Sequence, residues 1–315
     1  MSLALIFPGQ GSQAVGMGKA LAEGFAPARA VFDEVDAALG EKLSAIMWNG
    51  PAEALTLTEN AQPALMAVSM AALRVLSSEA GIEVGSDVAF VAGHSLGEYS
   101  ALAAAGSLTL ADTARLLRIR GRAMQSAVAV GDGAMAALLG LELEVAASVA
   151  AEAAQGQVCQ VANDNGAGQV VLSGDKAAVE RAVEIAKARG ARRAVMLQVS
   201  APFHCALMRP AADAMAQALA GVSVRPPAVP LVANVAARPA IEPAEIVRCL
   251  IAQVTGTVRW RESVVFMAGQ GVATWYEVGA GKVLSGLVKR IAEGAAASSV
   301  GTPEDVAAVK AAVGR

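Results

Sequence analysis

The sequence predicts an α/β protein, with a core built on a largely parallel sheet and a smaller subdomain inserted into it. Three observations support this prediction. Short apolar runs alternate with amphipathic helical stretches along the chain, as in parallel sheets joined by helices. This alternation is interrupted in the middle of the chain by a hairpin-like pair of apolar runs. The chain has 315 residues, of which 55% are hydrophobic, so it can bury a large core.

The first half of the chain supplies the start of the core. Residues 3–7 form a short apolar run, which we interpret as a buried strand, and a glycine-rich turn follows over residues 7–13. Residues 88–92 are a second apolar run followed by a helix-compatible stretch over residues 98–105. Because catalytic loops in such sheets lie at the carboxyl ends of strands, we expect the loops after these two strands to share one rim.

The middle of the chain reads as a small subdomain of its own. The predicted elements are a strand at 134–139, a helix at 143–154, a strand at 157–162, a turn at 163–166, a strand at 169–173, a helix at 175–189 ended by Gly190, and a strand at 193–199. This βαββαβ order is the ferredoxin-like pattern. We predict a core over residues 1–126 and 196–315 and a subdomain over 127–195. The alternative is that these strands continue the main sheet. Residues 231–235 and 274–278 are further core strands.

Composition excludes several classes of protein. The net charge is −3 and both signs are spread along the chain, which is unlike a nucleic-acid-binding stripe or a basic membrane-binding helix. No run approaches the roughly 20 apolar residues of a membrane span, although the mean hydropathy is +0.49. The N-terminus lacks a basic, signal-like start, and the three cysteines are odd in number and far apart. We therefore expect a cytoplasmic protein that binds neither nucleic acid nor membrane.

A nucleophile candidate follows the second strand. Residues 93–97 read G-H-S-L-G, which is the G-x-S-x-G pattern between a strand and a helix. Two glycines permit a turn too tight for a Cβ, and this turn exposes the Ser95 hydroxyl beside free N–H groups at a helix start. An exposed hydroxyl and nearby donors for an oxyanion are what attack on an acyl group requires. The alternative is an ordinary turn that carries a serine between glycines.

A serine nucleophile needs a base, and the chain has two histidines. His94 precedes Ser95 on the same turn, so its side chain should point away from the hydroxyl and serve packing or hydrogen bonding. His204 lies in a predicted loop after a strand, and elimination makes it the base candidate if an imidazole activates Ser95. The alternative is a surface histidine with no catalytic role.

Residues 110–127 have helical periodicity and carry an arginine on their apolar face. Arg120 lies among Leu116, Leu117 and Met124. The opposite face holds three arginines that we expect to be solvated: Arg115, Arg118 and Arg122. A guanidinium on an apolar face needs an anion, which is either an internal carboxylate or a substrate carboxylate bound by both ends of the guanidinium. No cluster of His, Cys and acidic residues has metal-ligand spacing, so no metal site is predicted.

Several motifs follow one another along the chain: FPGQGSQ at 7–13, GHSLGEYSAL at 93–102, RG at 120–121, PFHCALM at 202–208, VRW at 258–260 and EVGAGKVL at 277–284. In this order and spacing, over essentially the whole chain, they resemble malonyl-CoA:acyl carrier protein transacylases of fatty-acid synthesis. The resemblance implies an α/β-hydrolase-like core with a ferredoxin-like insert, which agrees with the predicted element order. It also implies malonyl-CoA as substrate, acyl carrier protein as partner, no bound cofactor and a monomer.

The resemblance implies a role for each matching residue. Ser95 forms the malonyl ester, His204 is the base and then the acid, and Arg120 pairs with the malonyl carboxylate. The N–H groups of Gln10 and Leu96 form the oxyanion hole. The main-chain carbonyl of Gln253 orients the base.

The match differs from the family pattern in one segment and leaves other functions open. Residues 254–257 differ from the usual Asn-Pro type of turn, which weakens the Gln253 match. Related methylmalonyl-transferring enzymes often carry Gln after the serine and Ser before the histidine; Leu96 and Phe203 here favour malonyl. The alternatives are a serine esterase or thioesterase of the α/β-hydrolase type, a polyketide-associated acyltransferase, and a non-catalytic module that binds a carrier protein.

Overall fold

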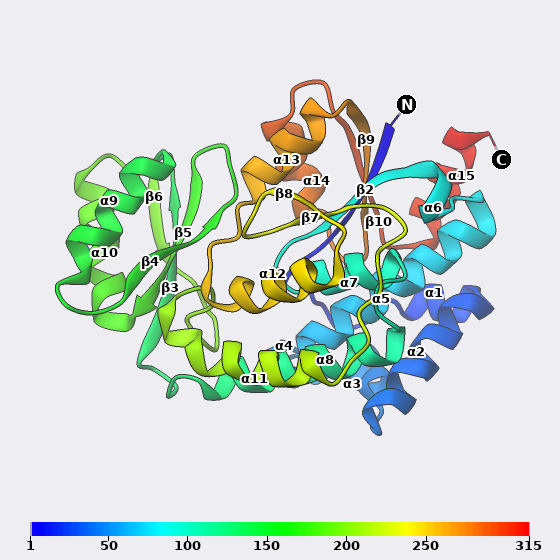
Figure 1. Cartoon of the computed structure of the whole chain (residues 1–315), viewed down its shortest axis with the longest axis horizontal. Coiled ribbons are helices and arrows are strands. Elements are labelled where there is room, and N and C mark those ends of the chain that lie inside the picture. Colours follow the sequence, from blue (N-terminus) through cyan, green and yellow to red (C-terminus); the bar gives the residue numbers. More distant parts are fainter. Residues whose placement is uncertain (1, 315) are drawn as a thin grey trace.

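Two sheets of different construction organise the chain, which a computed structural model describes over residues 2–314 (Figure 1). The strands are β1 (Ser2–Phe7), β2 (Val88–Gly93), β3 (Gly133–Leu139), β4 (Cys159–Asp164), β5 (Gln169–Asp175), β6 (Arg193–Met196), β7 (Leu231–Ala233), β8 (Arg238–Ala240), β9 (Val272–Val278) and β10 (Ala296–Val300).

Helices cover both sheets. They are α1 (Lys19–Gly24), α2 (Ala26–Leu39), α3 (Leu43–Asn49), α4 (Ala52–Thr56), α5 (Thr58–Ala80), α6 (Val84–Asp87), α7 (Gly97–Ala104), α8 (Leu110–Ser126), α9 (Leu143–Ala154), α10 (Lys176–Ala188), a 3₁₀ turn η1 (Ala206–Met208), α11 (Arg209–Ala220), α12 (Pro243–Thr255), α13 (Trp260–Gly269), α14 (Val283–Ile291) and α15 (Pro303–Val313).

The larger sheet has the order β10-β9-β1-β2-β7-β8. Its central pairs are parallel, and β8 forms an antiparallel hairpin with β7. Phe7 at the end of β1 pairs with Gly93 at the end of β2. The loops that follow these two strands therefore start side by side, as the sequence predicts.

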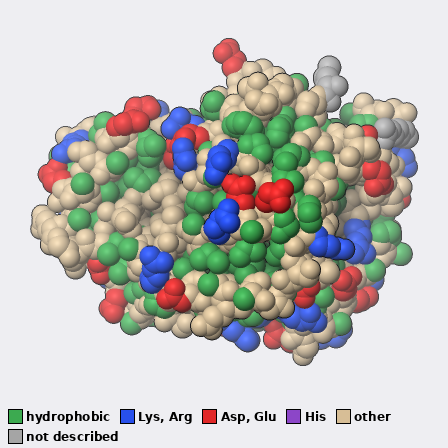
Figure 2. Space-filling view, viewed as in Figure 1, with side chains coloured by type: hydrophobic (Ala, Val, Ile, Leu, Met, Phe, Trp, Pro, Cys, Tyr) green, Lys and Arg blue, Asp and Glu red, His purple; other side chains and the backbone are tan. Residues whose placement is uncertain are grey.

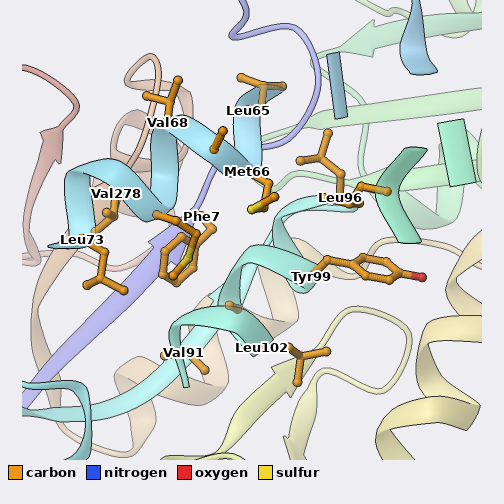
Figure 3. Packing of buried hydrophobic residues seen from close by; sticks show 14 of the residues in the cluster. Phe7, Leu65, Met66, Val68, Leu73, Val91, Leu96, Tyr99, Leu102 and Val278 are labelled. Carbon is orange, nitrogen blue, oxygen red and sulfur yellow. The ribbon is translucent and has the colours of Figure 1, made fainter. Parts of the chain in front are cut away.

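Strand β1 is buried on both faces, which explains its continuous apolar run. Leu5 and Phe7 pack into a cluster with helices α5 and α7, and Figure 3 shows Phe7 beside Val68 and Leu73 of α5. Ala4 and Ile6 point to the other face, into a cluster built on α13 and α14. The period-2 alternation thus divides one strand between two cores.

The smaller sheet has the order β4-β5-β3-β6 and is antiparallel throughout its pairs. Helices α9 and α10 pack on it around an alanine- and valine-rich core of their own. The element order is βαββαβ, so the predicted ferredoxin-like pattern is confirmed. Figure 1 shows this unit beside the larger sheet. The division of the chain at residues 127 and 195 stays a prediction.

Several predicted strand ends were wrong. Strand β5 ends at Asp175 and not at residue 173, because Asp175 still pairs with β3. Residues 163–164, predicted as a turn, belong to β4, because they pair with Val171 and Val170 of β5. Strand β6 ends at Met196 and not at residue 199, because the chain leaves β3 there; Leu197 and Val199 are 36% exposed. Strand β7 ends at Ala233 and not at residue 235, because Asn234 turns towards the β2 loop.

The surface carries mixed charge. Figure 2 shows acidic and basic side chains interspersed with apolar ones on one face. Over residues 2–314, none of the helices combines the length and the apolar character that crossing a membrane requires.

Candidate active site

The turn after β2 holds Ser95 in a strained conformation. Its φ is 53°, in the left-handed region that side chains other than glycine rarely adopt. At both flanking positions the backbone leaves no room for a side chain larger than that of glycine. A Cβ on Gly93 would lie 2.0 Å from the backbone of Gly97, and a Cβ on Gly97 would lie 2.2 Å from the carbonyl oxygen of Phe7. The G-x-S-x-G spacing therefore encodes a turn that only this glycine placement allows.

His204 faces Ser95. The Nε2 atom of His204 lies 2.8 Å from Ser95 Oγ, and its Nδ1 atom lies 2.9 Å from the main-chain carbonyl oxygen of Gln253. A carbonyl oxygen can only accept, so Nδ1 carries the proton and Nε2 is free to accept the serine proton. Burial, reinforced by the positive charge of Arg120, lowers the pKa of His204 to about 3. The imidazole is therefore a neutral acceptor at neutral pH.

Arg120 reaches the same hydroxyl from helix α8. Its Nη2 donates to Ser95 Oγ at 3.2 Å and to Gln253 Oε1 at 2.8 Å, and its Nη1 donates to Gln62 Oε1 at 2.7 Å. The residue is 1% exposed. Over residues 2–314 no carboxylate forms an ion pair with it, and its Nε atom has no hydrogen-bond partner. The hydrogen bonds of the guanidinium are thus to neutral oxygens, and the Glu98 carboxyl acts on it from a distance without contacting it. No carboxylate of the described residues occupies its N–H groups, so they can receive an anion at the serine.

The prediction for the opposite face of α8 was wrong at one position. Arg115 and Arg122 have exposed side chains, as expected, but Arg118 is 6% exposed. Arg118 forms ion pairs with Glu41 and with Glu59 and a hydrogen bond to Asn60 Oδ1. Side chains from the end of α2 and the start of α5 cover this part of α8, and helical periodicity carries no information about them.

The resemblance implies that the N–H groups of Gln10 and Leu96 form the oxyanion hole. Both line the cavity that contains Ser95. Within residues 2–314, the N–H groups of Gln10 and Leu96 donate no hydrogen bond, whereas the N–H of Ser95 donates to Asn234 Oδ1 at 2.8 Å. The Gln10 side chain is held by Thr58, whose Oγ1 donates to Gln10 Oε1 at 2.7 Å. Two unused donors thus remain beside the nucleophile.

His94 turns to the smaller sheet. Its Nε2 atom lies 2.9 Å from Asn165 Oδ1, and its ring packs 5.8 Å from that of Trp260. Burial lowers its pKa. This agrees with the packing and hydrogen-bonding role that the sequence suggests.

Three polar side chains that sequence reasoning missed complete the site: Gln62, Glu98 and Asn234. Glu98 Oε2 accepts from Gln253 Nε2 at 2.6 Å and from Asn234 N at 3.3 Å. Burial raises the pKa of Glu98 to about 7. In the sequence, Glu98 stands out only as an acidic residue in a mostly apolar helix beside the serine turn. This signal is not informative, because an acidic residue in the first turn of a helix commonly just stabilises the helix dipole.

The site opens into a cavity of about 800 Å³ between the two sheets. Its floor holds Ser95, Arg120 and His204. One wall comes from the smaller sheet, including Asn165, and another from α14, including Val283. This volume suits an elongated organic ligand, and the apolar walls suit an aliphatic chain.

Comparisons with known proteins agree with this geometry. The acyl transferase domain family matches residues 4–309. The chain is 48% identical over 305 residues to "Malonyl CoA-acyl carrier protein transacylase" of Escherichia coli strain K12, covering 97% of each. It is 57% identical to the solved acyl-carrier-protein-S-malonyltransferase of Bartonella henselae, covering 100% of both chains with a TM-score of 0.97. A solved malonyl-transacylase in complex with a type II PKS acyl-carrier protein is 42% identical, covering 99% of this chain and 100% of that one, with a TM-score of 0.95.

Proposed function

The chain belongs to the acyl transferase domain family, and we infer that it is an enzyme that transfers the malonyl group of malonyl-CoA to acyl carrier protein. One structural observation connects this function to particular residues. A single hydroxyl, Ser95 Oγ, lies 2.8 Å from the imidazole of His204 and 3.2 Å from the guanidinium of Arg120, which forms no ion pair within residues 2–314. A nucleophile, a base and a carboxylate receptor therefore converge on one atom.

We propose a ping-pong mechanism with two matched half-reactions. Ser95 Oγ bonds to the thioester carbon of malonyl-CoA while its proton moves to His204 Nε2. The carbon–sulfur bond then breaks, and His204 returns the proton to the sulfur of coenzyme A. In the second half, the phosphopantetheine thiol of the carrier protein gives its proton to His204 and attacks the ester. Ser95 Oγ leaves and takes the proton back.

The developing negative charge needs donors that are free before the reaction. We propose that Gln10 N and Leu96 N bind the oxyanion, because both are unused and border the cavity. The main-chain carbonyl of Gln253 would orient His204, taking the place of the acid of a Ser-His-Asp triad.

Malonyl differs from acetyl by a second carboxylate, and Arg120 supplies its receptor in this proposal. The fork of the guanidinium matches a carboxylate, and burial makes the pair stronger than it would be in water. No cofactor is needed for this chemistry, since the serine, the histidine and the thiols carry every step.

Three finer points complete the proposal. We propose an α/β-hydrolase type of core, since the nucleophile turn follows a strand of a parallel sheet. A monomer is the simplest assembly, because every proposed catalytic group comes from one chain. A cytoplasmic location is consistent with three buried cysteines that form no disulfide.

We propose that the product supplies fatty-acid chain elongation. Polyketide assembly is the alternative, because one similar solved structure is a complex with a type II PKS acyl-carrier protein. A hydrolase of similar fold is disfavoured by the charge of Arg120, which an uncharged acyl group would leave buried and unpaired.

The experiment is incubation with radiolabelled malonyl-CoA, with and without acyl carrier protein, followed by peptide mapping. We expect one malonyl group on Ser95, no label on the Ser95→Ala variant, and transfer of the label when carrier protein is added. The matched base test compares His204→Ala, expected to slow acylation by about 10²- to 10⁴-fold, with His94→Ala. A label on Cys205, release of free malonate without transfer, or a larger loss in His94→Ala would contradict the proposal.

A further inference from the structure

Glu98 is a fully buried carboxylate for which the proposed mechanism has no use. It is 0% exposed, and within residues 2–314 no cation forms an ion pair with it. Its Oε1 atom has no hydrogen-bond partner. Burying a carboxyl group costs desolvation free energy, which hydrogen bonds to the group must offset. Its contacts therefore indicate what it does.

Both contacts of Glu98 are to groups that hold the reacting residues. Gln253 Nε2 donates to Glu98 Oε2 at 2.6 Å, and the other end of the same carboxamide, Oε1, accepts from Arg120 at 2.8 Å. Asn234 N donates to Glu98 at 3.3 Å, and the Asn234 side chain accepts from Ser95 N. One carboxylate is thus one residue away from both the guanidinium and the nucleophile turn.

The orientation of the Gln253 carboxamide is the critical variable. If it turned over, an NH₂ group would face the Arg120 guanidinium, and two donors would meet. Three acceptors of Gln253 Nε2 oppose this flip of the carboxamide: Glu98 Oε2 at 2.6 Å, the carbonyl oxygen of Ser95 at 2.9 Å and Asn234 Oδ1 at 3.4 Å. The bond to Glu98 is the shortest, and when this carboxyl is ionised the bond is roughly twice as strong as a neutral one.

We propose that Glu98 is a positioning residue for malonyl recognition, which keeps the Gln253 oxygen facing Arg120 and so holds the guanidinium beside Ser95. The inference rests on the proposed role of Arg120 as receptor of the malonyl carboxylate. It predicts that Glu98 contributes to the choice between malonyl and acetyl, beyond any contribution to the folding of the chain.

The test compares two substitutions that both remove the negative charge. Glu98→Gln keeps an oxygen that can accept from Gln253 Nε2 and Asn234 N, whereas Glu98→Met has nearly the same size and no such acceptor. The measurement is kcat/KM for malonyl-CoA and for acetyl-CoA. We expect the malonyl-to-acetyl ratio of Glu98→Met to be about fivefold below that of Glu98→Gln, the value of one neutral hydrogen bond. Equal ratios in the two variants would overturn the inference.

A second buried carboxylate provides the matched control. Asp36 is 4% exposed and accepts from Ser44 N at 3.0 Å and Ser44 Oγ at 2.6 Å, away from the cavity lining. Asp36→Asn and Asp36→Leu should share one malonyl-to-acetyl ratio, whatever they do to stability. A merely structural role of Glu98 would give the same pattern as this control pair.

Coupling to Gln253 is the second arm. In a Gln253→Leu background, Glu98→Met should change the ratio no further than Glu98→Gln does, because the carboxamide is already gone. If Glu98→Met does not fold, Glu98→Asp replaces it: a side chain one methylene shorter cannot keep the 2.6 Å contact, so its ratio should fall below that of the wild type.

Failure of the proposed function has its own signature. If the wild type forms no malonyl ester on Ser95, or if Arg120→Ala keeps the malonyl preference, the role of Arg120 is wrong and this inference falls with it. If the wild type passes both tests and the two Glu98 variants share one ratio, Glu98 alone is misassigned.

Discussion

Two arginines on helix α8, two residues apart, differ in what surrounds their charge. Arg118 and Arg120 are both nearly inaccessible, at 6% and 1% exposure. Arg118 forms ion pairs with Glu41 and Glu59. Arg120 contacts the amide oxygens of Gln62 and Gln253 and the hydroxyl of Ser95. A step of two residues turns the helix by about 200°, so the two side chains enter different surroundings.

The difference supports the proposal that Arg118 is a structural cation and Arg120 a carboxylate receptor. Burying a charge is costly, and a nearby carboxylate offsets that cost at Arg118. At Arg120 neutral amide oxygens satisfy the N–H groups without cancelling the charge, so a ligand carboxylate is still strongly attracted. Burial of an arginine is thus uninformative by itself, and the charge of its acceptors decides its role.

The largest expected effect is the loss of malonyl transfer when the Arg120 guanidinium is removed. In Arg120→Ala we expect kcat/KM for malonyl-CoA to fall by about 30- to 5,000-fold, the equivalent of about 2–5 kcal/mol for a desolvated charge pair. Acetyl-CoA should be unchanged or better, because acetyl has no second carboxylate. Arg118→Ala is the control and should keep the malonyl preference. An equal fall for both substrates in Arg120→Ala would make Arg120 a second structural cation.

A conservative change at the same position sharpens the comparison. Arg120→Lys keeps a positive charge but loses the planar fork that donates to Gln62 and Gln253 at once. We expect malonyl transfer about tenfold below that of the wild type, since one hydrogen bond to a charged group is lost. Steady-state kinetics with both acyl-CoA substrates measure it. Full recovery by lysine would mean that charge alone selects malonyl.

The two arginines should also differ in their influence on His204. Burial is the larger cause and the charge of Arg120 the next in lowering the pKa of His204 to about 3. A positive neighbour disfavours the imidazolium, so Arg120→Ala should raise this pKa. It should stay below the ordinary value of about 6.5, because burial remains. Arg118→Ala should leave it unchanged.

Nuclear magnetic resonance of ¹³C-labelled histidine between pH 4.5 and 8 can follow this titration, because the chain has two histidines and His94→Ala assigns them. We expect His204 to remain neutral over that range in the wild type. A wild-type midpoint near 6.5 would show that neither burial nor Arg120 acts on the base as described.

The smallest expected effect is on stability. Arg118→Gln should lower the free energy of unfolding by about 1 kcal/mol, because Glu41 and Glu59 are 42% and 29% exposed and water can solvate them afterwards. Arg120→Gln should change stability less or increase it, because it removes a buried charge that no carboxylate of residues 2–314 contacts directly. Urea unfolding of both variants measures the difference. The reverse order would mean that a carboxylate compensates Arg120 in solution.

Several features could be predicted because they are local. The glycines around Ser95 report a turn whose sterics involve neighbours in the chain, and the period of α8 places Arg120 on the apolar side. His204 was found by counting, since two histidines leave few candidates for a base. The βαββαβ order follows from apolar runs and turns. Strand ends were less secure, because a strand's length depends on how far its partner continues to pair, as at residues 163–164 of β4 against β5.

By itself the sequence determined the α/β fold class and the nucleophile turn, and it pointed to the residues that the proposed mechanism uses. Only the tertiary structure decided that Arg118 is buried against Glu41, and that Glu98 reaches Gln253 and Asn234, which lie 155 and 136 positions away. Dihedral limits and helical period act between near neighbours and leave a mark on the local pattern. A hydrogen bond between distant segments depends on how helices and sheets pack, and no local pattern records it.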